Sequence, residues 1–236
     1  MIDIHSHILP AVDDGAKDAE ESSALLSMMY AQGITEVIAT PHFPPDSESL
    51  EGFLSRIAAA KSVLENKASG TVHPEIYYGC EIYYFPNMGN VESLERVTLA
   101  GSRYLLIDFT FTDFEPPVIR DIKALYDNLG IIPIAAHVER YFPARGYKKL
   151  LKLIENGECV CQINASSFFS RNFSKPVRKL VKGGYAQVIA SDSHSVSKRP
   201  PKIEAALNEI KTEIGEKYYS NLLKSQAALK KSILGD

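Results

Sequence analysis

The chain has 236 residues, of which 45% are hydrophobic and 23% charged, which is enough to bury one substantial core. Its formal net charge is −3, so the composition argues against nucleic acid and other polyanions as partners. The chain starts without a basic, apolar leader and has no run near the roughly 18 apolar residues of a membrane span, so we expect a cytoplasmic protein without membrane insertion.

Short apolar runs alternate with helix-length segments along the chain, which is typical of repeated β-α units and a parallel sheet. The first helix is predicted to begin with Asp18 and Glu21 in capping-box spacing, and glycines such as Gly130 precede the next strand where a helix should end. Two helices are predicted after the last strand, at residues 203–214 and 217–234. No linker interrupts the series, so residues 1–236 are predicted to form a single α/β domain. Seven strands are predicted, at residues 2–5, 35–40, 76–82, 104–109, 131–136, 159–164 and 186–191.

Two pairs of potential metal ligands lie at the first and last predicted strands. His5 and His7 are alternate residues of a strand, separated by Ser6, so both imidazoles point to the same side and can reach one ion. Asp192 and His194 repeat this spacing after the last apolar run. Each pair also has an ordinary explanation, because the HxH pattern arises by chance and Asp192 is suited to cap a helix.

Two acids and two further histidines lie within or directly after other predicted strands. Glu81 and Asp108 interrupt apolar runs, where an isolated carboxylate is costly to bury, so each needs a metal or a buried salt-bridge partner. His42 and His137 follow strands and are either ligands or hydrogen-bonded strand-end histidines. His73 precedes Pro74 away from any strand end, and we exclude it from the site.

Taken together, these residues predict one multinuclear metal site. Every predicted strand except the sixth contributes, and the strand ends of a closed barrel converge on one mouth. Imidazoles and carboxylates without thiolates favour Mn, Fe or Zn. The nine predicted ligands are His5, His7, Asp14, His42, Glu81, Asp108, His137, Asp192 and His194.

The ordered motifs IDIHSHILPAVDDGA, ATPHF, GCEIY, HVERY, QINASS and ASDSH resemble those of the polymerase and histidinol phosphatase (PHP) family. Specifically, they are similar to those of its manganese-dependent bacterial protein-tyrosine phosphatases, which are associated with capsule and exopolysaccharide clusters. The resemblance extends from Met1 to about residue 210. It implies a distorted seven-stranded (β/α)7 TIM-like barrel, the PHP fold, with up to three Mn²⁺ ions, and Fe, Zn or Mg as alternatives.

The resemblance also implies how the ligands are shared. One ion would be held by His5, His7, Glu81 and Asp192, a second by Glu81, Asp108 and His137, and a third by Asp14, His42 and His194. This sequence departs from the family pattern at Asp108, where glutamate is common, and at Val138, where proline usually follows the histidine.

Such a centre would hydrolyse a phosphomonoester with a metal-bridging hydroxide, because divalent ions lower the pKa of bound water and stabilise the leaving group. Arg140 and Arg199 follow predicted ligand histidines and are expected to bind the phosphate oxygens, with surface ion pairing as the alternative. The cysteine route to tyrosine dephosphorylation requires an arginine six residues after the thiolate. None of Cys80, Cys159 and Cys161 has one. Each lies in or beside a predicted core strand, so we expect buried, reduced thiols.

We therefore predict a metal-dependent protein-tyrosine phosphatase. By resemblance, its substrate would be a phosphotyrosine protein, specifically a bacterial tyrosine kinase that controls capsule or exopolysaccharide synthesis. The alternatives are a PHP-family phosphoesterase for a small molecule such as histidinol phosphate or for nucleic-acid ends, and a noncatalytic binding module. Tyr83, Tyr84, Phe85, Phe168 and Phe169 are either the lining of an acceptor pocket or ordinary core and rim residues.

Overall fold

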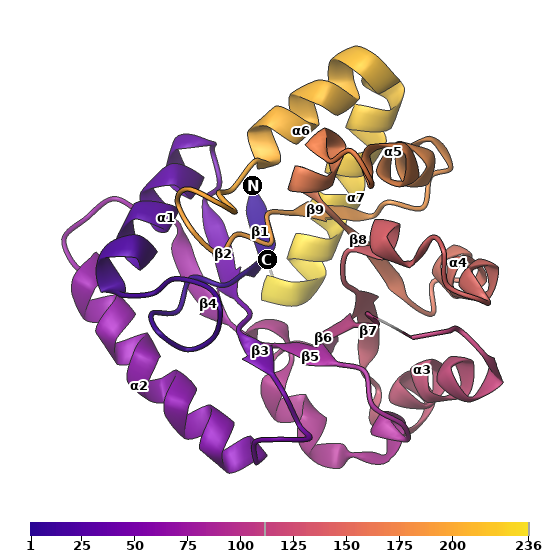
Figure 1. Cartoon of the computed structure of the whole chain (residues 1–236), viewed down its shortest axis with the longest axis horizontal. Helices are drawn as coiled ribbons and strands as arrows, with labels where there is room; N and C mark the ends of the chain where they lie inside the picture. The colour runs from indigo at the N-terminus through magenta and orange to yellow at the C-terminus, as the bar shows by residue number, and fades with distance from the viewer. Residues whose placement is uncertain (111, 236) are drawn as a thin grey trace.

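Parallel strands form the centre of the molecule and helices surround them (Figure 1). The computed structural model describes residues 1–110 and 112–235. The strands curl into a half-barrel of the α/β class, in agreement with the predicted alternation of strands and helices. The strands are β1 (Ile2–Ser6), β2 (Glu36–Ala39), β3 (His42–Phe43), β4 (Glu75–Tyr78), β5 (Glu81–Tyr83), β6 (Tyr104–Asp108), β7 (Ile132–Ala135), β8 (Val160–Asn164) and β9 (Val188–Ala190).

Each of the seven predicted strand regions contains a strand. In two places the chain forms two short strands in succession, β2 followed by β3 and β4 followed by β5. The strands pair in the order β1-β2-β4 in one sheet and β3-β5-β6-β7-β8-β9 in the other. Between β2 and β3 lies Pro41, which has no N–H to donate. Between β4 and β5, Gly79 lies so close to Leu99 that an added Cβ would be 2.8 Å from the leucine side chain. Pro41 and Gly79 thus lie at the two places where the strands are divided.

The first strand and the segment after the last strand are hydrogen-bonded to each other. Asp192 N donates to His5 O at 2.9 Å, and His7 N donates to Ser193 O at 2.9 Å. These bonds bring the motif with His5 and His7 next to the motif with Asp192 and His194, although the two are far apart in the sequence.

The helices are α1 (Ala19–Ala31), α2 (Leu50–Ala68), α3 (Pro116–Leu129), α4 (Tyr147–Glu155), α5 (Ser174–Lys182), α6 (Ile203–Glu209) and α7 (Glu216–Leu234). The predicted cap of α1 is confirmed, because Asp18 Oδ1 accepts a hydrogen bond from Glu21 N at 2.8 Å. Gly130 ends α3 with a φ of 66°, a left-handed conformation that glycine adopts readily. The predicted helix at 203–214 is α6 followed by a π-helical turn, Ile210–Ile214.

Helix α7 packs against the apolar inner face at the amino-terminal ends of the strands. Leu229 and Ile233 join a buried cluster with Ile2 of β1 and Val188 of β9, and Gln226 Nε2 donates to Ile2 O at 2.8 Å. This end of the half-barrel is therefore filled. The carboxyl ends of the strands remain available for polar side chains. Among the helices of residues 1–110 and 112–235, none has the length and apolar character needed to cross a membrane.

Candidate functional site

Glu81 lies at the centre of four histidines. Its Oε2 is 3.2 Å from His5 Nε2, 3.4 Å from His7 Nε2 and 3.0 Å from His42 Nδ1. Its Oε1 is 3.0 Å from His137 Nε2. Burial raises the pKa of the Glu81 carboxyl, but the surrounding imidazoles outweigh this effect and hold that pKa well below its usual range.

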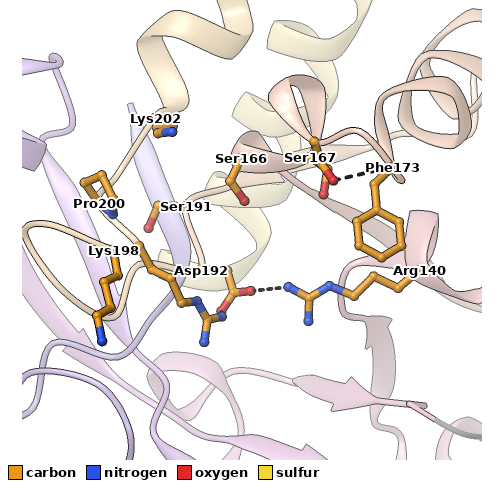
Figure 2. A pocket seen from close by; sticks show the side chains of 11 residues that line it. Arg140, Ser166, Ser167, Phe173, Ser191, Asp192, Lys198, Pro200 and Lys202 are labelled. Atoms are coloured by element: carbon orange, nitrogen blue, oxygen red, sulfur yellow. Dashed lines mark hydrogen bonds and ion pairs between the residues drawn. The ribbon is translucent and has the colours of Figure 1, made fainter.

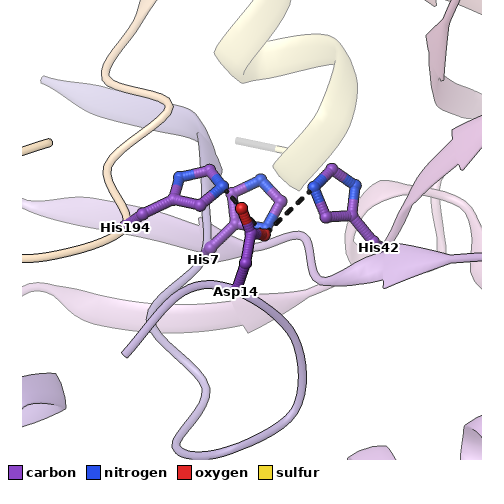
Figure 3. A group of neighbouring side chains, drawn as sticks. All are labelled: His7, Asp14, His42 and His194. Atoms are coloured by element: carbon purple, nitrogen blue, oxygen red, sulfur yellow. Dashed lines mark ion pairs between the residues drawn. The ribbon is translucent and has the colours of Figure 1, made fainter. Parts of the chain in front are cut away.

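The structure brings all nine predicted ligands into one cluster. Asp192 Oδ1 lies 3.5 Å from His5 Nε2 and 3.6 Å from His7 Nε2, which joins the last motif to the first. The remaining residues form three groups with potential ligand atoms within 4.8 Å of one another, and Figure 3 shows the group that contains Asp14. The groups are His7, Asp14, His42 and His194; His5, His7 and Glu81; and Glu81, Asp108 and His137.

Two histidine nitrogens in the cluster fit a metal ion better than a hydrogen-bond network. His42 Nδ1 and His194 Nε2 are buried and make no hydrogen bond, although Glu81 Oε2 and Asp14 Oδ1 are 3.0 Å and 3.3 Å away, respectively. An unsatisfied buried polar atom costs about 1–3 kcal/mol. Imidazole nitrogens and carboxylate oxygens at this spacing suit a divalent cation.

The loop after β1 folds back onto the cluster at Gly15. An added Cβ on Gly15 would lie 2.2 Å from His7 O, so only glycine permits this approach, and Ala16 N donates to His7 O at 3.0 Å. The turn places Asp13 and Asp14 on the same side as the histidines.

Asp13 was not among the predicted ligands, yet it contacts one of them directly. Its Oδ2 lies 2.7 Å from His7 Nδ1 and accepts from His42 N at 3.0 Å. Burial lowers the pKa of His7, but the contacts with Asp13 and Glu81 raise it to about 10. Carboxylates that bind the second nitrogen of a ligand histidine orient the ring and increase its basicity. The adjacent acids in VDDG are the only sequence signal for this role.

Strand β8, the one predicted strand without a ligand, provides side chains that hold the ligands of other strands. Gln162 Oε1 accepts from His137 N at 2.8 Å and lies 3.1 Å from His5 Nδ1. Gln162 Nε2 donates to Asn164 Oδ1 at 2.7 Å, and Asn164 Nδ2 donates to Asp192 Oδ2 at 2.5 Å. A hydrogen on His5 Nδ1 leaves Nε2 free to face Glu81. The two polar residues of QIN in an apolar strand are the signal for this function.

Tyr141 connects another two predicted ligands. Its hydroxyl accepts from Phe109 N at 2.9 Å, donates to Asp108 Oδ1 at 3.0 Å and lies 3.2 Å from His137 Nδ1. Since the hydroxyl hydrogen goes to Asp108, the ring of His137 donates from Nδ1 and presents Nε2 to Glu81. Asp108 Oδ2, in contrast, lies 3.7 Å from His137 Nε2.

Two of the candidate ligands have left-handed backbone conformations. The φ angle is 35° at His137 and 49° at Asp192. Non-glycine residues adopt this region at a cost of about 1–3 kcal/mol, and such strain concentrates at functional sites. Here it turns both side chains into the cluster directly after their strands.

Arg140 and Arg199 bind the same carboxylate at the edge of the cluster. Arg140 Nη2 donates to Asp192 Oδ2 at 2.8 Å, and Arg199 Nη2 donates to Asp192 Oδ1 at 2.9 Å. Arg199 Nη1 also lies 3.6 Å from Asp14 Oδ2. Both contacts are ion pairs, and their shared carboxylate is buried whereas the arginine side chains are partly exposed. Both arginines line a cavity of about 280 Å³ (Figure 2).

The expected aromatic residues have different positions. Tyr83 is 41% exposed and stacks on His42 with a centroid distance of 5.3 Å, whereas Tyr84 and Phe85 pack against the core and Phe168 is buried. A second cavity, of about 460 Å³, adjoins Arg140 and has an aromatic lining that includes Phe109, Tyr141 and Phe173.

The cysteines lie outside the cluster. Cys80, Cys159 and Cys161 are all buried and free, as predicted, and burial raises the pKa of each thiol. His73 is absent from the three groups and contacts the carbonyl oxygen of Pro74 instead.

Known proteins share this sequence and fold. Residues 1–230 match the family described as "Capsular polysaccharide synthesis, CpsB/CapC". The tyrosine-protein phosphatase CpsB of Streptococcus pneumoniae is 35% identical over 236 aligned positions, which cover 92% of each chain. The putative tyrosine-protein phosphatase CapC of Staphylococcus aureus is 33% identical, with coverage of 94% of this chain and 87% of that one. A solved structure also aligns with this chain, with a TM-score of 0.78 and 27% identity, and covers 96% of this chain and 95% of that one. It comes from work on YwqE of Bacillus subtilis and CpsB of Streptococcus pneumoniae, which are described as unique metal-dependent tyrosine phosphatases.

Proposed function

This chain belongs to the CpsB/CapC family, and from that premise we propose that it is a metal-dependent phosphatase that hydrolyses phosphotyrosine in proteins. The observation that carries the proposal is the buried cluster around Glu81 with Arg140 and Arg199 at its edge. Relatives that are named tyrosine-protein phosphatases support the substrate class.

The cluster would hold up to three ions, with Mn²⁺ as the first candidate and Fe, Zn or Mg as alternatives. When bound, such ions supply positive charge for the phosphoryl group and lower the pKa of water. Glu81 would contribute to two of the proposed ligand sets, in agreement with its place in two of the three groups of potential ligands. The proposed sets are His5, His7, Glu81 and Asp192; Glu81, Asp108 and His137; and Asp14, His42 and His194.

The two arginines would bind nonbridging oxygens of the phosphate, because the planar guanidinium matches two oxygens at once. Water attacks phosphorus and forms the new P–O bond, while the bond from phosphorus to the tyrosine oxygen breaks. Phosphate and tyrosine are released, and the departing phenolate takes up a proton. Asp192, held by Arg140, Arg199 and Asn164, would keep the arginines beside the ions.

We also infer that the two sheets act as one distorted seven-stranded (β/α)7 barrel. In this interpretation β2 with β3, and β4 with β5, each form one interrupted strand. The hydrogen bonds Gly79 N to Ala39 O at 3.0 Å and Glu81 N to Pro41 O at 3.1 Å support it, because they continue the pairing across both interruptions. The bonds between β1 and the segment after β9 would close the barrel.

The biological substrate is proposed to be a phosphorylated tyrosine kinase that controls capsule or exopolysaccharide synthesis. The family description, capsular polysaccharide synthesis, supports the pathway, and the names of the relatives support the phosphotyrosine.

A substrate panel tests the proposed reaction. The protein is reconstituted separately with Mn²⁺, Fe²⁺, Zn²⁺ and Mg²⁺, and phosphate release is measured from two peptides that differ only in phosphotyrosine or phosphoserine. Histidinol phosphate and a 5′-phosphorylated oligonucleotide complete the panel. We expect kcat/KM to be at least about tenfold higher for phosphotyrosine than for phosphoserine, because phenolate is the better leaving group.

Equal or faster turnover of histidinol phosphate would replace the proposal with a small-molecule phosphatase. Preferential release from the oligonucleotide would indicate a phosphoesterase for nucleic-acid ends. Stoichiometric metal binding without turnover of any of the four substrates would favour a binding module.

A further inference from the structure

The cavity beside the arginines extends beyond the candidate metal cluster and is unusually cationic. We call it the cationic cavity and define it by Arg140, Lys198, Arg199, Lys202, Asp192 and Ser170. Four of these residues carry positive charge and one carries negative charge. The whole chain has a net charge of −3, so the positive charge here is a local feature.

The single acid of the cationic cavity is already paired. Asp192 accepts hydrogen bonds from both arginines at 2.8 Å and 2.9 Å. Within residues 1–110 and 112–235, no ion pair involves Lys198 or Lys202. Lys202 Nζ has an aromatic neighbour, the Phe169 ring, with 5.8 Å to the centroid. The lysines therefore retain charge for an external anion.

A tight turn positions Lys198 and Arg199 in the loop after His194. Lys198 N and Arg199 N donate to Ser195 Oγ at 3.2 Å and 3.1 Å, and His194 N donates to Arg199 O at 3.0 Å. His194 is a candidate ligand, so the turn ties the lysine directly to the site.

The opposite side of the cationic cavity carries hydroxyl groups. Ser170 Oγ accepts from Asn172 N and Phe173 N, both at 3.3 Å, and retains its own O–H for donation. Ser166 also lines the cavity (Figure 2). Ammonium and hydroxyl donors around a volume of about 280 Å³ suit a carboxylate or phosphate.

We propose that the cationic cavity binds a second anionic group on the same phosphopeptide, a few residues from the phosphotyrosine. This inference rests on the proposed function, in which the two arginines bind the phosphate to be hydrolysed. Lys198 and Lys202 then face the part of the peptide next to the phosphotyrosine. They select peptides that carry a carboxylate or a second phosphate in that part. The cavity is thus a specificity subsite.

Matched peptides test the preference. One series has a single phosphotyrosine and places glutamate at each position from three residues before it to three residues after it. A second series has glutamine at the same positions, and a third has a second phosphotyrosine. Initial rates give kcat and KM, and peptides with a nonhydrolysable phosphonate in place of the phosphate give Kd by fluorescence anisotropy. Comparison of the glutamate series with the series that carries a second phosphotyrosine shows whether the bound group is a carboxylate or a phosphate.

We expect at least one acidic or doubly phosphorylated peptide to have a KM and a Kd about 3 to 20-fold lower than its glutamine counterpart, with kcat little changed. In the double variant Lys198→Ala/Lys202→Ala this preference should disappear, and it should weaken at high salt in the parent protein. Lys224→Ala, a change at an exposed lysine of α7, is the matched control and should retain the preference. Hydrolysis of p-nitrophenyl phosphate, which lacks a second anion, should stay within about twofold in all variants.

The inference is overturned if no acidic or doubly phosphorylated peptide binds better than its glutamine counterpart, or if the double variant retains the preference. Hydrolysis of the glutamine peptides in that case would leave the proposed function intact. If the phosphonate peptides show the preference while no phosphotyrosine peptide is hydrolysed, the cationic cavity is confirmed as an anion subsite and the proposed reaction is wrong.

Discussion

Arg140 and Asp192 are joined directly, with Arg140 Nη2 2.8 Å from Asp192 Oδ2. Arg199 makes the corresponding contact with Asp192 Oδ1 at 2.9 Å. Asp192 is also a candidate ligand that lies 3.5 Å from His5 Nε2. Experiment can therefore separate two roles for the arginines, the proposed binding of phosphate and the support of Asp192.

The first prediction concerns these arginines. Arg140→Ala and Arg199→Ala should each lower kcat/KM on a phosphotyrosine peptide by roughly 10 to 1000-fold, about the loss of one or two charge-assisted contacts in the transition state. Lysine at either position should restore only part of the activity, because it keeps the charge but loses the bidentate geometry. Steady-state kinetics and metal content are measured on the same samples, and metal content should stay unchanged.

Two results would contradict this assignment. Activity within about twofold of the parent for both alanine variants would mean that the ions alone bind the phosphate. Loss of metal in parallel with activity would show that the arginines act mainly by supporting Asp192.

The second prediction concerns the metals. Elemental analysis should find two or three ions per chain, and a chelator should abolish activity while circular dichroism shows that most of the fold remains. His5→Ala should remove activity, because His5 Nε2 faces both Glu81 and Asp192. His73→Ala is the matched control and should stay within about twofold of the parent. A protein that binds no stoichiometric metal under any reconstitution would contradict the prediction.

Thiol alkylation provides a second control for the metal mechanism. Burial raises the pKa of Cys80, Cys159 and Cys161, so the native thiols should react slowly and activity should survive iodoacetamide. Rapid inactivation at one labelled cysteine would argue for a thiol in the reaction.

The third prediction concerns Gln162, which contacts His5 Nδ1 and His137 N. Gln162→Ala should weaken metal affinity about 10 to 100-fold, because the ring of His5 loses the acceptor that orients it. Gln187→Ala is the matched control, since Gln187 Oε1 accepts from Cys161 N on the same strand and does not contact a candidate ligand. Metal titrations measure both affinities, and equal affinities for the two variants would show that Gln162 has only a structural function.

The candidate ligands stand out in the sequence because each lies within or just after a short apolar run, and this local pattern survives folding. His5 and His7 have strand spacing, and the acids Glu81 and Asp108 stand out in apolar strands. Because the ends of parallel strands converge, local patterns at several strands indicate a shared site without any knowledge of distances. The strand boundaries were less accurate, since the interruptions at Pro41 and Gly79 depend on neighbouring chain segments.

The residues that hold the ligands were decided by tertiary structure. Asp13, Gln162, Asn164 and Tyr141 have no metal-binding pattern of their own, and their role depends on which side chain the sheet places opposite them. The same is true of the pairing of both arginines with Asp192.

The sequence by itself determined the types of the candidate ligands, their strand-end positions and the α/β class, because these follow from residue chemistry and local periodicity. Only the tertiary structure decided that the His5 and Asp192 motifs meet, that β8 supports the ligands of other strands, and that Lys198 shares a cavity with Arg140. The physical reason is that contacts between distant segments depend on the register and curvature of the sheet, which many residues set together.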